Sequence, residues 1–222
     1  MATILPLETL LARTAERHHH LCPRQVLGVR MGMLAADVLQ LGLPQSDKRL
    51  FVFMETDGCT SDGVAVATGA WVGRRTMRMV DYGKVAATFV DTETGRAIRI
   101  FPSPQARQLA AQAAPEAPDR WHAQLIGYQR LPDSDLLVVN PGRLTVDLPA
   151  IIGQEGDRRT CWQCGEEISN QRELEIDGRV WCRSCAGDRY FVASTSDHFR
   201  RGQSVVSTSE FEEAPTCCSA AA

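Results

Sequence analysis

Apolar residues near the start of the chain recur at helical spacing. In the segment PLETLLARTAERH, Leu10 and Leu11 follow Leu7 by three and four positions, behind a proline that suits a helix start. A second apolar face begins behind Pro23 and continues to about Leu41, where the residues LGLPQ interrupt it. The pattern therefore predicts two N-terminal helices with a histidine-rich segment between them.

Further along the chain the pattern becomes typical of strands. Residues 49–56, RLFVFMET, form a continuous apolar run with aromatic and β-branched side chains, which predicts a buried strand. Residues 81–101 contain two more such runs around a turn at Asp91–Gly95 and predict a hairpin. Residues 57–69 predict a turn followed by a short helix of small residues. Residues 103–131 predict two helices around a proline-rich break, and residues 135–149 predict a return to strands.

This order of elements defines the expected fold class and domain organisation. Strands that meet through hairpins, with helices beside them, predict an α+β domain over residues 1–152, with a mixed or antiparallel sheet packed with helices. A polar linker follows at residues 153–159, and a small module with two CxxC pairs occupies residues 160–190. Residues 191–222 are rich in Ser, Thr and Glu and predict a flexible tail.

Composition limits the classes of partner and compartment. The chain has 222 residues, of which 44% are hydrophobic and 23% charged, with a formal net charge of −3. This balance argues against nucleic acid or an anionic membrane as the main partner. No apolar run approaches the ~18 residues of a membrane-spanning helix, and the first apolar stretch contains Glu8 without a small-residue cleavage site. We expect a soluble, cytoplasmic protein.

Four of the eight cysteines lie in two CxxC pairs, Cys161 with Cys164 and Cys182 with Cys185. Two such turns can direct four thiolates tetrahedrally onto Zn²⁺, and an Asp-Gly turn between them predicts the hairpin that brings the pairs together. A redox dithiol would need only one pair, beside a βαβ unit. The spacing predicts a structural zinc ribbon whose closed site performs no catalysis.

A second candidate metal site lies in the histidine-rich segment HHHLCP. In an extended loop His18, His20 and Cys22 would point to one side and His19 away. Cys22 would also lie at the start of the Pro23 helix, where the helix dipole favours a thiolate. The alternative is a solvated polar loop that binds nothing.

Cys59 repeats the situation of Cys22, because it ends a turn after a buried strand and precedes a short helix. Two thiols at two helix starts, with imidazoles beside one of them, suit Zn²⁺, Ni²⁺ or another borderline transition metal. The alternative is a small buried residue without a ligand.

Three ordered blocks resemble the FmdE family, which is named after a component of formylmethanofuran dehydrogenase. HHHLCPRQVLGVRMGMLA is similar to its HGHLCPG…G.RMG opening, METDGCTSDGVAVATG to its ETD.C..DA…TG block, and MRMVDYGKVAATFVDTETGRAIRI to its DYGKVA.T.V…TGRA.R block. The resemblance covers residues 18 to 101, and many members also carry a four-cysteine ribbon. His19 and Arg24 stand where the family usually has glycine, and Ala70 where many members have a cysteine.

The resemblance implies an α+β core, commonly a homodimer, with a metal held in a cleft. Carried over by position, His18, His20, Cys22 and Cys59 match the family's candidate ligands. Four further polar residues match positions that line the same cleft: Asp62, Asp81, Tyr82 and Lys84. The resemblance also implies an association with a molybdenum- or tungsten-dependent formylmethanofuran or formate dehydrogenase system, and with the molybdenum or tungsten cofactor of such a partner.

Three functions are consistent with these features. The first is a metal-binding accessory protein of such an oxidoreductase, in which the ribbon docks the partner. The second is a metal-dependent enzyme that acts on a small carbonyl or formyl substrate. The third is a zinc-ribbon regulator, which the interleaved acidic and basic residues of the ribbon disfavour. Near the C-terminus, the adjacent Cys217 and Cys218 are either a metal-transfer or resolving pair or an incidental feature.

Overall fold

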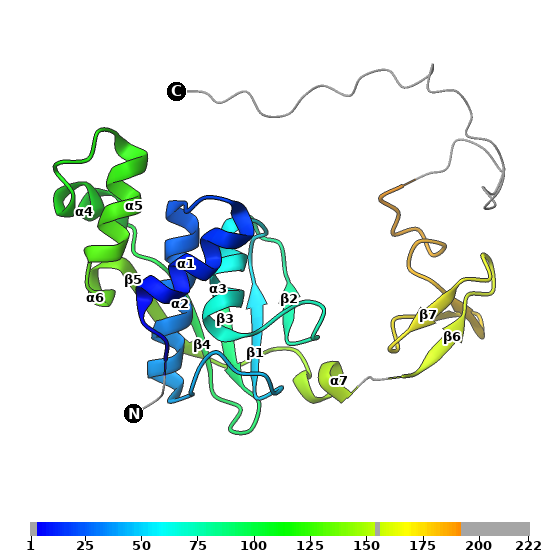
Figure 1. Ribbon diagram of the computed structural model, residues 1–222. Coiled ribbons are helices and arrows are strands. Elements are labelled where there is room, and N and C mark those ends of the chain that lie inside the picture. Colours follow the sequence, from blue (N-terminus) through cyan, green and yellow to red (C-terminus); the bar gives the residue numbers. More distant parts are fainter. Residues whose placement is uncertain (1–3, 154–155, 192–222) are drawn as a thin grey trace, which may run out of the picture. The chain divides into compact units, whose positions relative to one another are not determined.

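The computed structural model describes residues 4–153 and 156–191, without the side chain of His18. The chain divides into two compact units after Gln154, and each is described by itself. The first unit contains a five-stranded sheet in the order β2-β1-β3-β4-β5 (Figure 1). The strands are β1 (Leu50–Met54), β2 (Met77–Met79), β3 (Ala87–Asp91), β4 (Ala97–Pro102) and β5 (Leu137–Gly142).

The sheet is mixed, which confirms the predicted α+β class. β1 pairs in parallel with β2, and the other neighbouring strands of the sheet are antiparallel. The hairpin predicted over Asp91–Gly95 joins β3 to β4. The edge strand β2 did not emerge from the sequence, because three residues are too few to show an alternation of apolar and polar positions.

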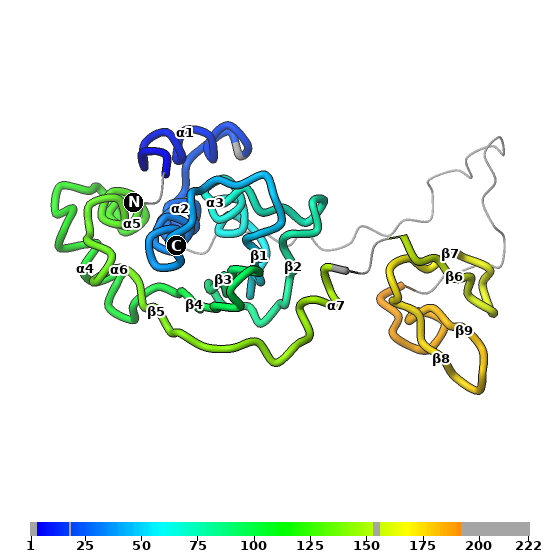
Figure 2. Tube along the Cα trace, turned by 90° about the horizontal axis from the view of Figure 1, so that it is seen from below, coloured from blue at the N-terminus to red at the C-terminus, as the bar shows by residue number. Residues whose placement is uncertain are grey.

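Helices cover one face of the sheet. α1 (Leu7–His18), α2 (Pro23–Leu39) and α3 (Cys59–Thr68) lie over that face, as the view along the sheet shows (Figure 2). Strand residues such as Val52, Phe89 and Ile100 point to these helices and share one apolar core with them. Within the described residues, no helix is long and apolar enough to cross a membrane.

The remaining helices of the first unit occupy two places. α4 (Ala106–Ala113), α5 (Arg120–Arg130) and α6 (Asp133–Leu136) form a group between β4 and β5 in the chain. The buried guanidinium of Arg30 in α2 holds this group in place, because it donates to the carbonyl oxygens of Tyr128 and Leu131 at 2.8 and 2.7 Å. α7 (Leu148–Gly153) follows β5 and packs its Leu148 on the opposite face of the sheet.

α2 and α3 cross at a contact between glycines. A Cβ atom on Gly28 would meet the carbonyl oxygen of Thr60, and one on Gly63 would meet the carbonyl oxygen of Gln25. One turn later, Gly32 faces the methyl group of Ala67. The absence of side chains lets the two backbones touch, in the way that small residues four apart allow in other close helix pairs. This crossing fixes the starts of the two helices relative to each other.

The hairpin between β3 and β4 is organised by a buried carboxylate. Asp91 accepts from Arg49 at 3.1 and 3.2 Å and from the hydroxyl of Thr94 at 2.9 Å. Burial acts to raise the pKa of Asp91, but these hydrogen bonds outweigh it and the pKa lies below its ordinary value. The ionised carboxylate therefore contributes to stability.

We expect Asp91→Asn to lower the stability of the first unit by about 2 kcal/mol at neutral pH, because it removes charged hydrogen bonds. The contribution is present above the unfolded-state pKa of an aspartate and is lost as the pH falls through the lower folded-state pKa. Urea unfolding across the acidic range should show the two proteins converging at low pH. A constant difference in the free energy of unfolding across that range would contradict the assignment. Asp47→Asn is the control, since Asp47 is an exposed carboxylate beside Arg49.

The second unit contains two small hairpins. β6 (Arg158–Thr160) pairs with β7 (Glu167–Ser169), and β8 (Leu174–Ile176) pairs with β9 (Arg179–Trp181). β6 begins inside residues 153–159, the segment interpreted as a linker from its polarity. The Asp-Gly turn predicted between the two CxxC pairs is confirmed, since Asp177 and Gly178 both have positive φ, as a tight hairpin turn requires.

Candidate metal centres

The four cysteines of the second unit converge on one point. The sulfur atoms of Cys161, Cys164, Cys182 and Cys185 all lie within 4.8 Å of one another. Four thiolates around Zn²⁺ at about 2.3 Å would place their sulfurs ~3.8 Å apart, so this cluster fits a tetrahedral zinc site. Residues 156–191 are therefore a four-cysteine zinc-binding module, called the zinc module below.

Electrostatics within the zinc module favour a bound cation. The backbone N–H groups of Cys164 and then of Cys182 lower the pKa of Cys161 to about 6, and the Cys182 N–H donates to the Cys161 sulfur at 3.3 Å. The pKa of Cys185 is raised to about 12, first by its hydrogen bond with Cys182 and then by burial and the other two sulfurs. Without a cation the four sulfurs cannot all ionise, whereas Zn²⁺ removes their mutual repulsion. The closed set of four thiolates leaves no position for a substrate.

The first unit brings Cys22 and Cys59 together. Cys22 is the residue before α2, and Cys59 is the first residue of α3, so the glycine crossing places the two thiols side by side. The Cys22 thiol lies close enough to Cys59 to raise the pKa of the Cys59 thiol. The backbone N–H of Cys22 donates to the buried side-chain oxygen of Gln25 at 2.7 Å, which holds the cysteine at the start of its helix.

The ionisation of Cys59 differs from the sequence-based expectation. Burial, followed by the hydrogen bond and charge of Cys22, raises the pKa of the Cys59 thiol, and the charge of Asp62 adds to the effect. A helix start alone would lower that pKa. Burial, the second thiol and the carboxylate together outweigh the helix start, so a nearby cation would favour the thiolate form of Cys59.

The histidines occupy the end of α1 and the loop behind it. His18 is the last residue of α1, and His19 has a left-handed backbone with a φ of 58°. The chain is therefore not extended at these two residues, whereas the predicted alternation of side chains requires an extended loop. His19 and His20 are both exposed. Among the described side chains, only the zinc module groups three or more metal-ligating residues. The structure therefore brings the two cysteines together, and a histidine ligand that would complete a metal site beside them stays a prediction.

The polar residues carried over from the resemblance lie in two places. Asp62 is in the first turn of α3, close enough to raise the pKa of Cys59. Asp81, Tyr82 and Lys84 form an exposed loop after β2, in which the Asp81 carboxylate accepts from the N–H of Gly83 at 2.9 Å. Cys217 and Cys218 lie outside the described residues.

Two residues that the sequence did not single out, the buried Glu55 and the half-buried Arg99, form an ion pair. Glu55, directly after β1, accepts two hydrogen bonds from Arg99 in β4, at 2.6 and 2.7 Å. The carbonyl oxygen of Glu55 also accepts from the N–H groups of Tyr82 and Lys84. The run RLFVFMET does contain Glu55 next to its last position, but the sequence does not show that Arg99 lies opposite Glu55 two strands away.

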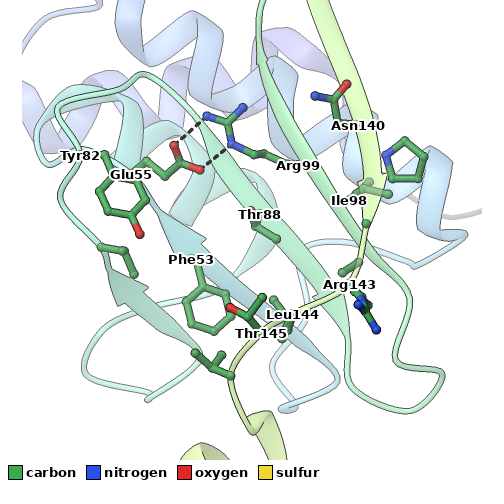
Figure 3. Close-up of a pocket in the computed structure, with 15 residues that line it drawn as sticks. Phe53, Glu55, Tyr82, Thr88, Ile98, Arg99, Asn140, Arg143, Leu144 and Thr145 are labelled. Atoms are coloured by element: carbon green, nitrogen blue, oxygen red, sulfur yellow. Dashed lines mark hydrogen bonds and ion pairs between the residues drawn. The ribbon is translucent and has the colours of Figure 1, made fainter.

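The ion pair borders a cavity of about 400 Å³ on the face of the sheet opposite α2 and α3 (Figure 3). Its walls come from the strands, from the loop containing Tyr82, and from the segment after β5. The lining includes Phe53, Thr88, Asn140 and Leu144.

Together these features define an α+β metal-binding protein with a separate zinc module. A family model described as "FmdE, Molybdenum formylmethanofuran dehydrogenase operon" matches residues 17–138, more than half of the chain. The chain belongs to the FmdE family. A second model, described as "Prokaryotic dksA/traR C4-type zinc finger", matches residues 156–191. This second match agrees with the observed cysteine cluster.

Two known proteins are similar to parts or all of this chain. A tungsten formylmethanofuran dehydrogenase FmdE-like protein from Syntrophus aciditrophicus has a similar fold, with a TM-score of 0.57 and 19% identity over 86% of this chain and 100% of the other. A protein from Archaeoglobus fulgidus described as "Probable S-adenosyl-L-methionine-binding protein" is 34% identical over 98 residues. That match covers 43% of this chain and only 27% of the Archaeoglobus protein, about a quarter of its length.

Proposed function

We propose that this FmdE-family protein is a metal-binding accessory protein of a molybdenum- or tungsten-dependent formylmethanofuran or formate dehydrogenase system. The observation that carries the proposal is the meeting of Cys22 and Cys59 at two helix starts held together by a glycine contact. Family membership and the fold shared with a protein of that name support the link to the dehydrogenase system.

The proposed cleft site uses the thiol pair as its fixed half. Cys22 is buried and Cys59 half-buried, so both are held in place with limited access to water. Two thiolates and one or two imidazoles from His18 and His20 suit Zn²⁺, Ni²⁺ or another borderline transition metal. A site with at most these four protein ligands can exchange a ligand for water or for a donor on another protein, as delivery of a metal requires.

The zinc module has a different part in this proposal. Its site is closed, so its contribution is contact with a partner. Exposed aromatic residues support this, since Trp162 lies 56% exposed and stacks beneath Arg179 at 3.9 Å. A reducing cytoplasm would keep all these thiols available for metal, and we propose a homodimer as the assembled form.

Metal content tests the cleft site. We expect the purified wild-type chain to bind two equivalents of metal, one in each unit, and Cys59→Ser to bind one, because a serine hydroxyl is a poor ligand for a borderline metal. Mass-spectrometric metal analysis after reconstitution measures both values. His19→Ala is the matched control for His20→Ala, since only His20 is proposed as a ligand.

Two outcomes would contradict the proposal. If the wild type binds a single equivalent and Cys59→Ser leaves that value unchanged, the cleft holds no metal. If affinity purification from cells that express a molybdenum or tungsten oxidoreductase does not recover that enzyme with the wild type, the accessory role fails even where the cleft binds metal.

A further inference from the structure

The cavity beside the Glu55–Arg99 pair has no part in the metal chemistry proposed above. It lies on the sheet face opposite α2 and α3, the helices at whose starts Cys22 and Cys59 lie (Figure 3). Its volume of about 400 Å³ falls in the range of small-molecule sites. The class of small molecule that could bind there depends on the side chains that line the cavity.

The floor of the cavity is apolar. Phe53 of β1 is half-buried there and packs against Phe51 at a ring-centroid distance of 5.0 Å. Leu144 and Val146, from the segment between β5 and α7, also line the cavity. In Figure 3 the Phe53 ring lies near Leu144 and Thr145. Such a floor accommodates a flat or branched hydrocarbon group.

One end of the cavity is polar but electrically balanced. The Glu55 carboxylate, which is 9% exposed, accepts hydrogen bonds from Nε and Nη2 of Arg99. Its negative charge balances the positive charge of that guanidinium. The Arg99 guanidinium also lies over the Phe101 ring at 4.8 Å, which fixes its plane. The pair therefore offers oriented hydrogen-bonding groups without net charge.

A second guanidinium at the rim is not balanced. Arg143 lines the cavity from the segment after β5 and has no hydrogen-bond or ion-pair partner within residues 4–153 and 156–191. Because the charges of Glu55 and Arg99 cancel, the side chains that line the cavity carry a net charge of one positive unit, which comes from Arg143. The neighbouring amide of Asn140 and hydroxyls of Thr88, Thr145 and Tyr82 add neutral donors and acceptors.

We infer that this cavity binds a small organic monoanion with an apolar body, such as an aromatic or branched-chain carboxylate or sulfonate. The hydrocarbon part would lie on Phe53, Leu144 and Val146, and the anionic group would meet Arg143. Tyr82, which is 64% exposed, would cover the mouth, because Glu55 holds the backbone of its loop. The site would be independent of both metal centres.

Paired fluorescent probes test this inference. 8-Anilinonaphthalene-1-sulfonate carries an apolar body and one negative charge, and N-phenyl-1-naphthylamine has a similar body without the charge. We expect the full-length protein to bind the sulfonate saturably, at about one equivalent per chain. Arg143→Gln should weaken the sulfonate about tenfold and leave the neutral probe unchanged, because one charge-assisted hydrogen bond is lost.

Two further variants separate this cavity from general surface binding. Val146→Asp, at an exposed position of the lining, should weaken the sulfonate more than the neutral probe. Arg107→Gln removes an exposed arginine from a different cavity, beside Tyr128, and should change neither affinity. Metal content should be the same in all these variants.

The inference would be overturned if Arg143→Gln left sulfonate affinity within about twofold of the wild type, or if Arg107→Gln reduced it equally. It would also be overturned if the wild type bound neither probe. These results would not bear on the cleft metal, since the variants leave Cys22, Cys59 and the histidines intact.

Discussion

Replacement of Cys161 by serine is expected to release zinc from the zinc module and to unfold residues 156–191. These hairpins are short, and among their described residues only Cys161 and Ile168 are buried apolar side chains. Metal binding to such a module contributes on the order of 10 kcal/mol, which exceeds any stability its own core provides. Hydrogen exchange by segment, together with zinc analysis, measures the effect.

The first unit should remain folded in that variant, because its core does not depend on the zinc module. Gln163→Ser is the matched control: it changes the same CxxC turn without removing a ligand. Retention of slow exchange in residues 156–191 after Cys161→Ser, with zinc lost, would show that the module folds without metal and would contradict the assignment.

The second large effect is expected at the crossing of α2 and α3. Gly63→Ala should destabilise the first unit by about 3 kcal/mol and lower its midpoint of thermal unfolding by roughly 10 °C, because the new methyl group overlaps the backbone of α2. The gain in helix propensity of about 1 kcal/mol is smaller than this overlap. Differential scanning fluorimetry and urea unfolding measure the change.

The same substitution should separate Cys22 from Cys59, since the two helix starts are held by this contact. Gly73→Ala is the control, because a Cβ atom at Gly73 meets nothing within 4 Å. Equal stability of the Gly63 and Gly73 variants would show that α2 and α3 can move apart without cost, and the crossing would then not explain the position of the thiol pair.

The zinc module depends on residues that are neighbours in the chain, whereas the crossing of α2 and α3 depends on residues that meet only in the fold. The zinc module follows from local spacing: two CxxC turns and an Asp-Gly hairpin each involve neighbours in the chain, so the cluster could be predicted without knowledge of the fold. The helices and the β3–β4 hairpin followed in the same way from periodicity and turn residues. Short or isolated elements, such as β2, did not.

The pair of Cys22 and Cys59 is an intermediate case. The sequence placed Cys22 and Cys59 each at a helix start, and both placements are confirmed. Their contact depends on Gly28 and Gly63, whose role in the crossing appears only once the two helices are packed. The raised pKa of Cys59 likewise results from burial, from the second thiol and from Asp62, not from its own helix.

By itself the sequence determined the α+β class, the main helices and strands, and the four ligands of the zinc module, because hydrophobic periodicity and cysteine spacing are properties of short segments. Only the tertiary structure decided that Glu55 pairs with Arg99 across β3, that Arg143 is left without an ionic partner among the described residues, and that a cavity forms between them. These relations join residues about 40 positions apart, and they arise when the strands take their order in the sheet.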